Sequence, residues 1–347
     1  MKIRNTVNGC ENVDLVEFQN PSAFSKALRE ILRRIIIPLS DEENREAYNQ
    51  QWDVASRNIE LTVEGLAKLL ARHPIFGAYA VGGVVNWLHD YFSAQQESVL
   101  KQRHLVYTEY DKKIPFRPEE DIMYVYMIAQ IASIINKTCS RLSRQEFKHL
   151  VETFQEANDI AVDVFKQYPT TMPRFTDHKR LSLKVVQKLD KPINCCPSLH
   201  IGYSMLLDNV ARIMILPQNP GVFEALRYST LRMFNSVLYT GQHSIIDVAF
   251  GMVLARKVFE SAYNTNYHDL TDAFGAMHQQ QPSIDYKEIQ RIYEYGAAAS
   301  GSLTDIVGEY LAANGYAKVN PDEDINGCYF DTQRKEIVKI VAQEADL

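Results

Sequence analysis

The chain has 347 residues, of which 46% are hydrophobic, so it can bury a sizeable core in one large helical domain or in a domain with an appendage. Its net charge is −6 with both signs mixed along the sequence, which argues against a nucleic-acid-binding surface. A phosphate-binding role would therefore depend on local cations.

The apolar stretches are too short to span a membrane. A spanning helix needs about 20 apolar residues, whereas the best candidates, 75–88 and 122–135, are shorter and contain Asn86 and Gln130. The N-terminus lacks the apolar core of a signal peptide. Five cysteines in a chain without such a signal are typical of thiols in a reducing compartment. We expect a cytoplasmic protein with no transmembrane span.

Residues 1–104 are predicted to form a helical scaffold. Apolar residues recur at three-and-four spacing between Pro21 and Pro38 and again over 59–70, which indicates amphipathic helices. Residues 75–102 are the most apolar early segment, and we expect them to form a buried helix.

A further helix is predicted to begin at Pro118, because proline suits the first helical turn and Glu119, Glu120 and Asp121 complement the positive end of the helix dipole. This structural role is sufficient to explain the three acids. If the protein binds Mg²⁺, these three carboxylates are the candidate ligands.

The central segment, 105–263, is predicted to carry the site. Ser143 to Glu146 has the spacing of a capping box and opens a long amphipathic helix to Tyr168. Residues 168–194 are polar and contain prolines, so they are candidates for a wall or lid over a pocket. Helices are then expected from Ser198, over 222–238 and from about His243, which makes the fold class all-α.

Residues 264–347 are predicted to be a polar linker and a small C-terminal appendage. The run Gln279 to Pro282 is typical of a linker or exposed loop. Asp322 to Gly327 imitates the first half of an EF-hand calcium loop, but the twelfth position is Gln333 instead of the glutamate that such loops use. A turn tipped by glycine explains this run better.

Two histidines occur in settings that suit chemistry. His243 and Asp247 are four positions apart, so on a helix a carboxylate could hold one imidazole nitrogen and direct the other outward. Pro197 suits the first turn of a helix, where the hydroxyl of Ser198 and free backbone N–H groups form an anion site beside His200. The adjacent Cys195 and Cys196 are better explained as small buried apolar residues than as reactive thiols.

Three motifs follow one another in a fixed order: Ile-Pro-Phe-x-Pro at 114–118, Pro-Ser-Leu-His at 197–200, and Ser-x₆-His-x₃-Asp from Ser236 to Asp247. This series resembles the type 2 phosphatidic acid phosphatase and vanadium haloperoxidase superfamily, particularly the branch like inositol phosphorylceramide synthase. The runs 168–174 and 190–194 are also similar to that branch. The resemblance covers roughly residues 105–255.

The resemblance implies an all-helical bundle with a pocket for phosphate or vanadate. In such a site the residue matching His243 attacks phosphorus or ligates vanadium, and the residue matching His200 is the general acid. Asp247 would orient His243, while Ser198 and Arg117 would bind phosphate oxygens.

The sequence departs from the superfamily pattern at two cations. Tyr110 stands where the first motif has lysine, and Val237 stands where the third motif has arginine. Some members place a lysine two positions before the histidine, where this chain has Gly241. Because phosphoryl transfer relies on positive groups around the phosphate oxygens, we expect Arg174, Lys112 or Lys113 to replace them.

These observations predict an enzyme acting on the phosphate or diphosphate of a small apolar molecule, such as a prenyl or other lipid phosphate, by hydrolysis through His243. The alternative is a terpene-cyclase-like lyase that ionises a prenyl diphosphate in the same pocket with Mg²⁺. A vanadium haloperoxidase ranks lower, because vanadate needs the missing lysine and arginine. An inactive binding module also ranks lower, and homo-oligomer formation is left open.

Overall fold

The computed structural model describes residues 23–36, 45–46, 49, 62–63, 65–139 and 141–340, and these residues are mostly helical, which confirms the all-α prediction. The helices include α1 Ala23–Ile36, α3 Pro74–Ser98, α4 Asp121–Tyr124, α5 Tyr126–Thr138, α6 Arg144–Gln167, α7 Leu181–Leu189, α8 Leu199–Met214, α9 Pro220–Tyr239, α10 Ile245–Ala262, α11 Phe274–Gln280, α12 Tyr286–Ala298 and α13 Leu303–Ala313, with short 3₁₀ turns at η4 Asp111–Lys113, η5 Pro118–Glu120 and η6 Thr271–Ala273.

Short strands form two small sheets. In the first, β1 (Arg103–Leu105) lies between β2 (Thr170–Thr171), to which it is parallel, and β3 (Lys318–Val319), to which it is antiparallel. The second is an antiparallel hairpin of β4 (Cys328–Asp331) and β5 (Glu336–Lys339). The first sheet therefore joins three distant parts of the chain at one end of the helical body.

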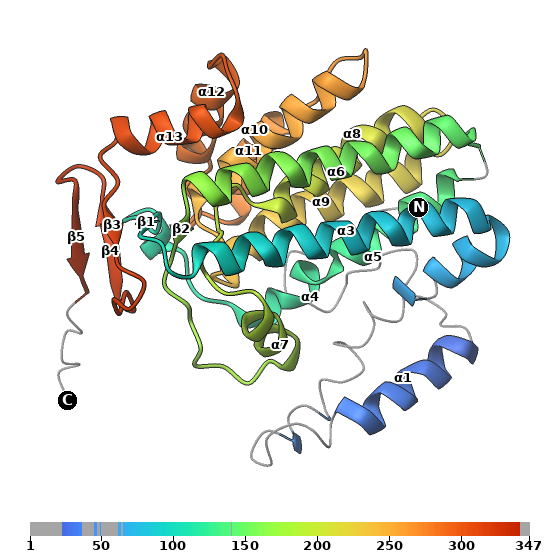
Figure 1. The fold of residues 1–347 in the computed structure, drawn as a ribbon, viewed down its shortest axis with the longest axis horizontal. Coiled ribbons are helices and arrows are strands. Elements are labelled where there is room, and N and C mark those ends of the chain that lie inside the picture. Colours follow the sequence, from blue (N-terminus) through green and yellow to red (C-terminus); the bar gives the residue numbers. More distant parts are fainter. Residues whose placement is uncertain are drawn as a thin grey trace.

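Helix α10 is the centre of the core. It packs against α6, α8, α12 and α13, and its residues from Ile245 to Ala255 are all buried. Burying a Val, Leu, Ile or Phe side chain contributes roughly 1.5–3 kcal/mol, so this run is a major source of stability. Figure 1 shows the long helices α3, α6, α8 and α9 extending beside one another across the molecule.

Helices α8 and α10 approach closely at a glycine. A Cβ atom added to Gly251 would lie 2.6 Å from the carbonyl oxygen of Ser198. No side chain fits at that distance, so glycine lets the start of α8 lie directly on α10. This contact brings the residues around Ser198 next to those at the start of α10.

The predicted capping box of the long central helix is confirmed. Ser143 Oγ accepts a hydrogen bond from Glu146 N at 3.2 Å, and Glu146 Oε2 accepts from Ser143 N at 2.8 Å. The helix predicted between Pro21 and Pro38 corresponds to α1. Of the helix predicted over 59–70, only part lies within the described residues, where 65–72 are helical.

The helix predicted over 75–102 exists as α3, but the expectation that it is buried is wrong. Ile75 is 53% exposed and Val85 is 59% exposed. The helix packs along α6 on one side and leaves its other apolar side on the surface. None of the described helices combines the length and the apolarity needed to cross a membrane.

The C-terminal part of the chain lies against the central segment. Helix α12 packs on α10, and Tyr286 donates a hydrogen bond to the side chain of Asn235 on α9. At the hairpin, Phe330 N donates to Tyr107 O at 2.8 Å. The run predicted as a linker also makes specific contacts, because Gln281 accepts a hydrogen bond from Tyr239.

Candidate active site

His200 and His243 converge, although 43 positions separate them in the sequence. Their ring centroids lie 5.7 Å apart, and Tyr124 stacks on His200 with a centroid distance of 3.9 Å. His200 is in the first turn of α8, whereas His243 immediately precedes the Ser244 cap of α10. The close approach of these two helix starts therefore brings the two imidazoles into one site.

His243 is held through its Nδ1 atom. Nδ1 lies 3.2 Å from the carbonyl oxygen of Cys195 and 3.6 Å from Asp247 Oδ2. Both neighbours are acceptors, so Nδ1 carries the proton in the neutral ring and donates to Cys195 O. Nε2 consequently keeps its lone pair, which is the arrangement of a nucleophilic or basic histidine.

The pairing of His243 with Asp247 has a different local origin from the one predicted. The sequence pattern placed both on one face of a helix, but α10 begins only at Ile245. Asp247 is the third residue of α10 and turns back to accept from Ser244 N at 2.7 Å, while Ser244 Oγ caps Asp247 N at 3.4 Å. This capping box brings the carboxylate to His243.

A second carboxylate caps the same helix. Asp111 is 3% exposed and its Oδ1 accepts from Ile245 N at 2.8 Å, while its Oδ2 accepts from the backbone and hydroxyl of Thr108. Burial raises the pKa of Asp111 to about 7 in spite of these hydrogen bonds. Asp111 therefore fastens the loop before α4 to the start of α10.

The loop before α8 is held by backbone contacts. Thr170 Oγ1 accepts hydrogen bonds from Cys195 N at 3.1 Å and Cys196 N at 2.9 Å, and the Cys196–Pro197 peptide is cis. Ser198 N donates to Asp247 O at 2.9 Å. Both thiols are buried, which raises their pKa well above the ordinary value. They are apolar packing residues, as the sequence suggested.

Ser198 is fully buried and acts as the N-cap of α8. Its hydroxyl accepts from Ile201 N at 3.4 Å. This leaves the N–H groups of the first turn, at Leu199 and His200, directed along the positive end of the helix dipole. Ser198 therefore contributes to this region chiefly through the backbone that it organises.

Arg174 lies beside the histidines. Its Nη1 donates to the carbonyl oxygens of Gly241 at 3.1 Å and Gln242 at 3.0 Å, the two residues immediately before His243. Its charge favours the ionised forms of Tyr124 and Cys195, although burial dominates the pKa of both. Arg174 thus places a cation next to the site at a position outside the superfamily motifs.

The turn that Arg174 holds also needs a glycine. Gly241 has φ +59°, and a Cβ atom there would lie 2.5 Å from the ring of Phe175. The backbone conformation and the aromatic wall therefore both exclude a lysine at this position.

Arg117, Lys112 and Lys113 have other contacts. Arg117 stacks on the ring of Tyr239 at 4.2 Å, with its Nη1 3.5 Å from Gln281 Oε1. Lys112 and Lys113 are exposed; their ammonium groups lie over the rings of Tyr329 at 4.8 Å and Tyr110 at 5.3 Å. The structure does not bring these three cations onto the two histidines.

Two of the three acids at the start of α4 are paired with different arginines. Glu120 pairs with Arg232 at 2.7 Å, and the buried Asp121 pairs with Arg180 at 2.7 Å and accepts from Ser182. Glu119 is exposed. In the part of the chain that the structure describes, no group of three or more His, Cys, Asp or Glu side chains is arranged to hold a metal ion.

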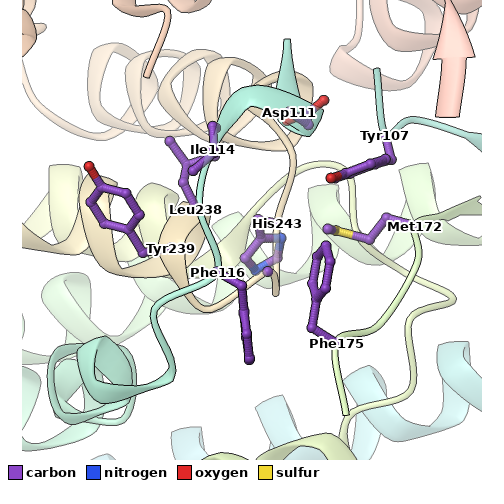
Figure 2. A pocket seen from close by; sticks show the side chains of 10 residues that line it. Tyr107, Asp111, Ile114, Phe116, Met172, Phe175, Leu238, Tyr239 and His243 are labelled. Atoms are coloured by element: carbon purple, nitrogen blue, oxygen red, sulfur yellow. The ribbon is translucent and has the colours of Figure 1, made fainter. Parts of the chain in front are cut away.

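Aromatic side chains enclose the pocket next to His243. Phe116 and Phe175 stack at 5.1 Å, and Tyr107 lies 6.3 Å from Phe175. Figure 2 shows the imidazole at the centre of these side chains, with Tyr239 to one side. The enclosed space is about 10 Å³, which is about the volume that one water molecule needs. A larger ligand would have to separate the aromatic rings.

Burial and the neighbouring His243 lower the pKa of His200 well below its ordinary value. His200 is consequently neutral at pH 7 until a negative charge is bound beside it. On residues next to His200 and His243, three polar atoms are buried without a hydrogen-bond partner: Asp247 Oδ1, Gln242 Oε1 and Arg174 Nε. Such atoms are rare in folded proteins and are satisfied by water or a ligand.

Sequence reasoning missed Tyr124, Asp111 and the aromatic pair Phe116 and Phe175. Asp111 carried a signal, since an acid at the start of a short turn in the first motif can cap another element. Tyr124 carried none, because its stacking on His200 depends on how α4 packs against α8.

Comparisons of the chain with protein-family models, curated proteins and solved structures give no match.

Proposed function

We propose that the chain is an enzyme that acts on the phosphate or diphosphate of an apolar molecule, as a phosphohydrolase with His243 as the nucleophile. The observation that carries the proposal is the convergence of His200 and His243, with Nδ1 of His243 held by Cys195 O and Asp247. The ordered motifs that resemble the phosphatidic acid phosphatase superfamily give independent support.

The phosphate group would lie between the two imidazoles and the first turn of α8. The N–H groups there and the cation of Arg174 stabilise negative charge on its oxygens. Binding requires Phe116 and Phe175 to separate, because the pocket between them holds about one water molecule. The aromatic pair would then exclude bulk water when it closes.

In the first chemical step, Nε2 of His243 attacks phosphorus and the bond to the leaving oxygen breaks. The bound phosphate raises the pKa of His200, so that ring is protonated in the complex and donates its proton to the leaving oxygen. Asp247 and Cys195 O stabilise the positive charge on His243. In the second step, water loses a proton to His200 and cleaves the nitrogen–phosphorus bond.

One observation favours the alternative, a lyase that ionises an allylic diphosphate. The rings of Tyr107, Phe116, Phe175 and Tyr239 line the pocket, and aromatic faces stabilise a carbocation. A lyase of this kind would use Mg²⁺ to neutralise the leaving diphosphate, whereas Glu120 and Asp121 each have an arginine partner.

Incubation with farnesyl diphosphate and with a chromogenic phosphate monoester, with and without Mg²⁺, tests the proposal. A phosphohydrolase releases an alcohol and phosphate, and a rapid acid-free quench traps phosphate on His243. Hydrocarbon with diphosphate, formed only with Mg²⁺, would instead support the lyase. Release of phosphate that proceeds equally fast in His243→Ala would overturn both mechanisms.

A further inference from the structure

A second hollow lies between α3, α5, α6 and the helical residues 65–69 that precede α3. Its volume is about 270 Å³, and almost its whole surface is apolar. Its walls include Ala80 from α3, Ala132 from α5 and Phe154 from α6. We refer to it as the α3/α5/α6 cavity.

Helix α8 links this cavity to the candidate active site. Tyr124, the last residue of α4, stacks on His200, and Met127, near the start of α5, lines the cavity. His200 is in the site, and Tyr203, three positions later on α8, also lines the cavity. Residues three apart lie on one side of a helix about 4.5 Å apart along its axis. The cavity therefore begins about one helical turn from the histidines.

The lining is poorly suited to water. A buried water molecule needs two to four polar partners, and a cavity of about 150 Å³ lined by Leu, Ile and Phe stays dry and binds benzene. Gln155 is a polar residue of the wall, but its amide nitrogen is already bonded to Asp159 at 2.8 Å and lies 3.3 Å from Asp90. The surface consequently favours a hydrocarbon.

From this geometry we propose that the α3/α5/α6 cavity holds the hydrocarbon chain of the molecule whose phosphate His243 receives. The inference rests on the proposed function. Scaling from benzene gives room for roughly ten to twelve carbon atoms, which defines the substrate class as the phosphate or diphosphate of a single chain of about that length. Two long acyl chains do not fit.

The cavity is also too small to hold a helix of a partner protein. A helix with its side chains is about 10–12 Å across, too wide to enter a space of this volume between three packed helices. The exposed apolar side of α3, which includes Val85, is a separate surface.

Binding of straight-chain alcohols of 6 to 16 carbons tests the cavity without phosphate. The sequence has two tryptophans, Trp52 and Trp87. Because Trp87 lines the cavity, its emission in a Trp52→Phe background reports an occupant. Affinity should rise about fourfold for each added methylene and level off near 12 carbons. An affinity that rises evenly to 16 carbons, or no change in Trp87 emission with any alcohol, would overturn the inference.

A substitution that fills the cavity with a larger side chain can be compared with one that conserves its volume. Ala132→Phe should weaken dodecanol binding at least tenfold, whereas Ile131→Leu, which conserves volume in the same wall, should leave it within twofold. If thermal unfolding shows that Ala132→Phe does not fold, Ala80→Phe on the facing helix gives the same test. Unchanged dodecanol binding in a folded filled variant would refute the assignment.

Turnover of dodecyl phosphate separates this inference from the proposed function. Suppose that Ala132→Phe blocks dodecanol binding while the wild-type protein releases no phosphate from any ester. The cavity is then shown to bind a hydrocarbon chain, and the proposed phosphohydrolase activity is refuted. If dodecyl phosphate is hydrolysed equally well by wild type and Ala132→Phe, the hydrolase stands and the cavity is not its chain site. His243→Ala should still bind dodecanol.

Discussion

The pocket beside His243 and the α3/α5/α6 cavity have no lining residue in common and are made of different kinds of side chain. The pocket is small and lined largely by aromatic rings, with the imidazole of His243 and the buried carboxylate of Asp111 among its walls. The cavity is far larger and almost free of polar groups. Chemistry and affinity are therefore expected to reside in separate compartments, so substitutions in the pocket should affect turnover more than binding of the apolar chain.

His243→Ala should give the largest effect. A nucleophile cannot be replaced by water at the same place, so kcat should fall by at least about 10⁴-fold, while dodecanol binding should stay within twofold. Steady-state phosphate release and Trp87 fluorescence measure the two quantities. The exposed His89, changed to alanine, is the control. Equal losses of turnover and chain binding would contradict the division into two compartments.

Asp247→Asn should slow turnover by roughly 10²–10³-fold and leave a folded protein. The amide can still accept from Ser244 N, but it no longer stabilises positive charge on His243. Loss of the charged cap should cost about 1 kcal/mol of unfolding free energy. Kinetics and urea unfolding on the same preparation test this. A variant with full activity would show that Asp247 serves only as a helix cap.

Arg174→Gln should weaken binding of inorganic phosphate by about 10-fold, because it removes the cation that lies beside the two histidines. Lys112→Gln and Lys113→Gln remove the same charge from exposed positions, and each should change the dissociation constant by less than twofold. Isothermal titration calorimetry gives all three constants. Equal effects of the three substitutions would mean that only the net charge of the region matters.

Sulfate binding should take up a proton. Burial and His243 lower the pKa of His200, and a bound dianion raises it again, so binding near pH 7 should bring roughly 0.5–1 proton onto the ring. Sulfate itself does not titrate there. Calorimetry in two buffers of different ionisation enthalpy gives the number of protons taken up per bound sulfate. His200→Gln should reduce that number to near zero. Uptake that persists in this variant would assign the proton to another group.

Asp111→Asn should have a pH-dependent effect on stability and little effect on turnover. The pKa of Asp111 is about 7 in the folded protein, above its ordinary value of 3.8. The folded state thus binds more protons between these pH values, and the unfolding free energy that Asp111 contributes is lost as pH rises through 7. The advantage of wild type over the variant should shrink by up to about 1.4 kcal/mol per pH unit from pH 5 to 7. Urea unfolding measures it, with the exposed Asp163→Asn as control; parallel curves would contradict it.

The sequence predicted what local rules decide. The capping box at Ser143, the helix that begins near Pro118 and the helical class all follow from spacing and capping chemistry. His200, His243 and Asp247 were chosen as candidate site residues from the motifs, and the structure brings these three together.

What the sequence could not supply depends on tertiary packing. The exposed side of α3 follows from the number of helices that surround it, which its composition does not encode. Arg174 was one of three cations with equal sequence support, and only the path of its loop past Gly241 distinguishes it. Tyr124 and the α3/α5/α6 cavity arise where helices meet, so no local pattern marks them.

The C-terminal hairpin adds a constraint of another kind. Its Phe330 N–H is bonded to Tyr107 O, and Thr332 donates to the carboxylate of Glu109, so a strand near the end of the chain holds the loop that carries Asp111 and Phe116. Glu109 in this loop and Thr332 in the hairpin turn are therefore in contact although 223 positions separate them. Among related sequences, positions 109 and 332 should therefore vary together, and an exchange of this hairpin between relatives should preserve function only if the loop is exchanged with it.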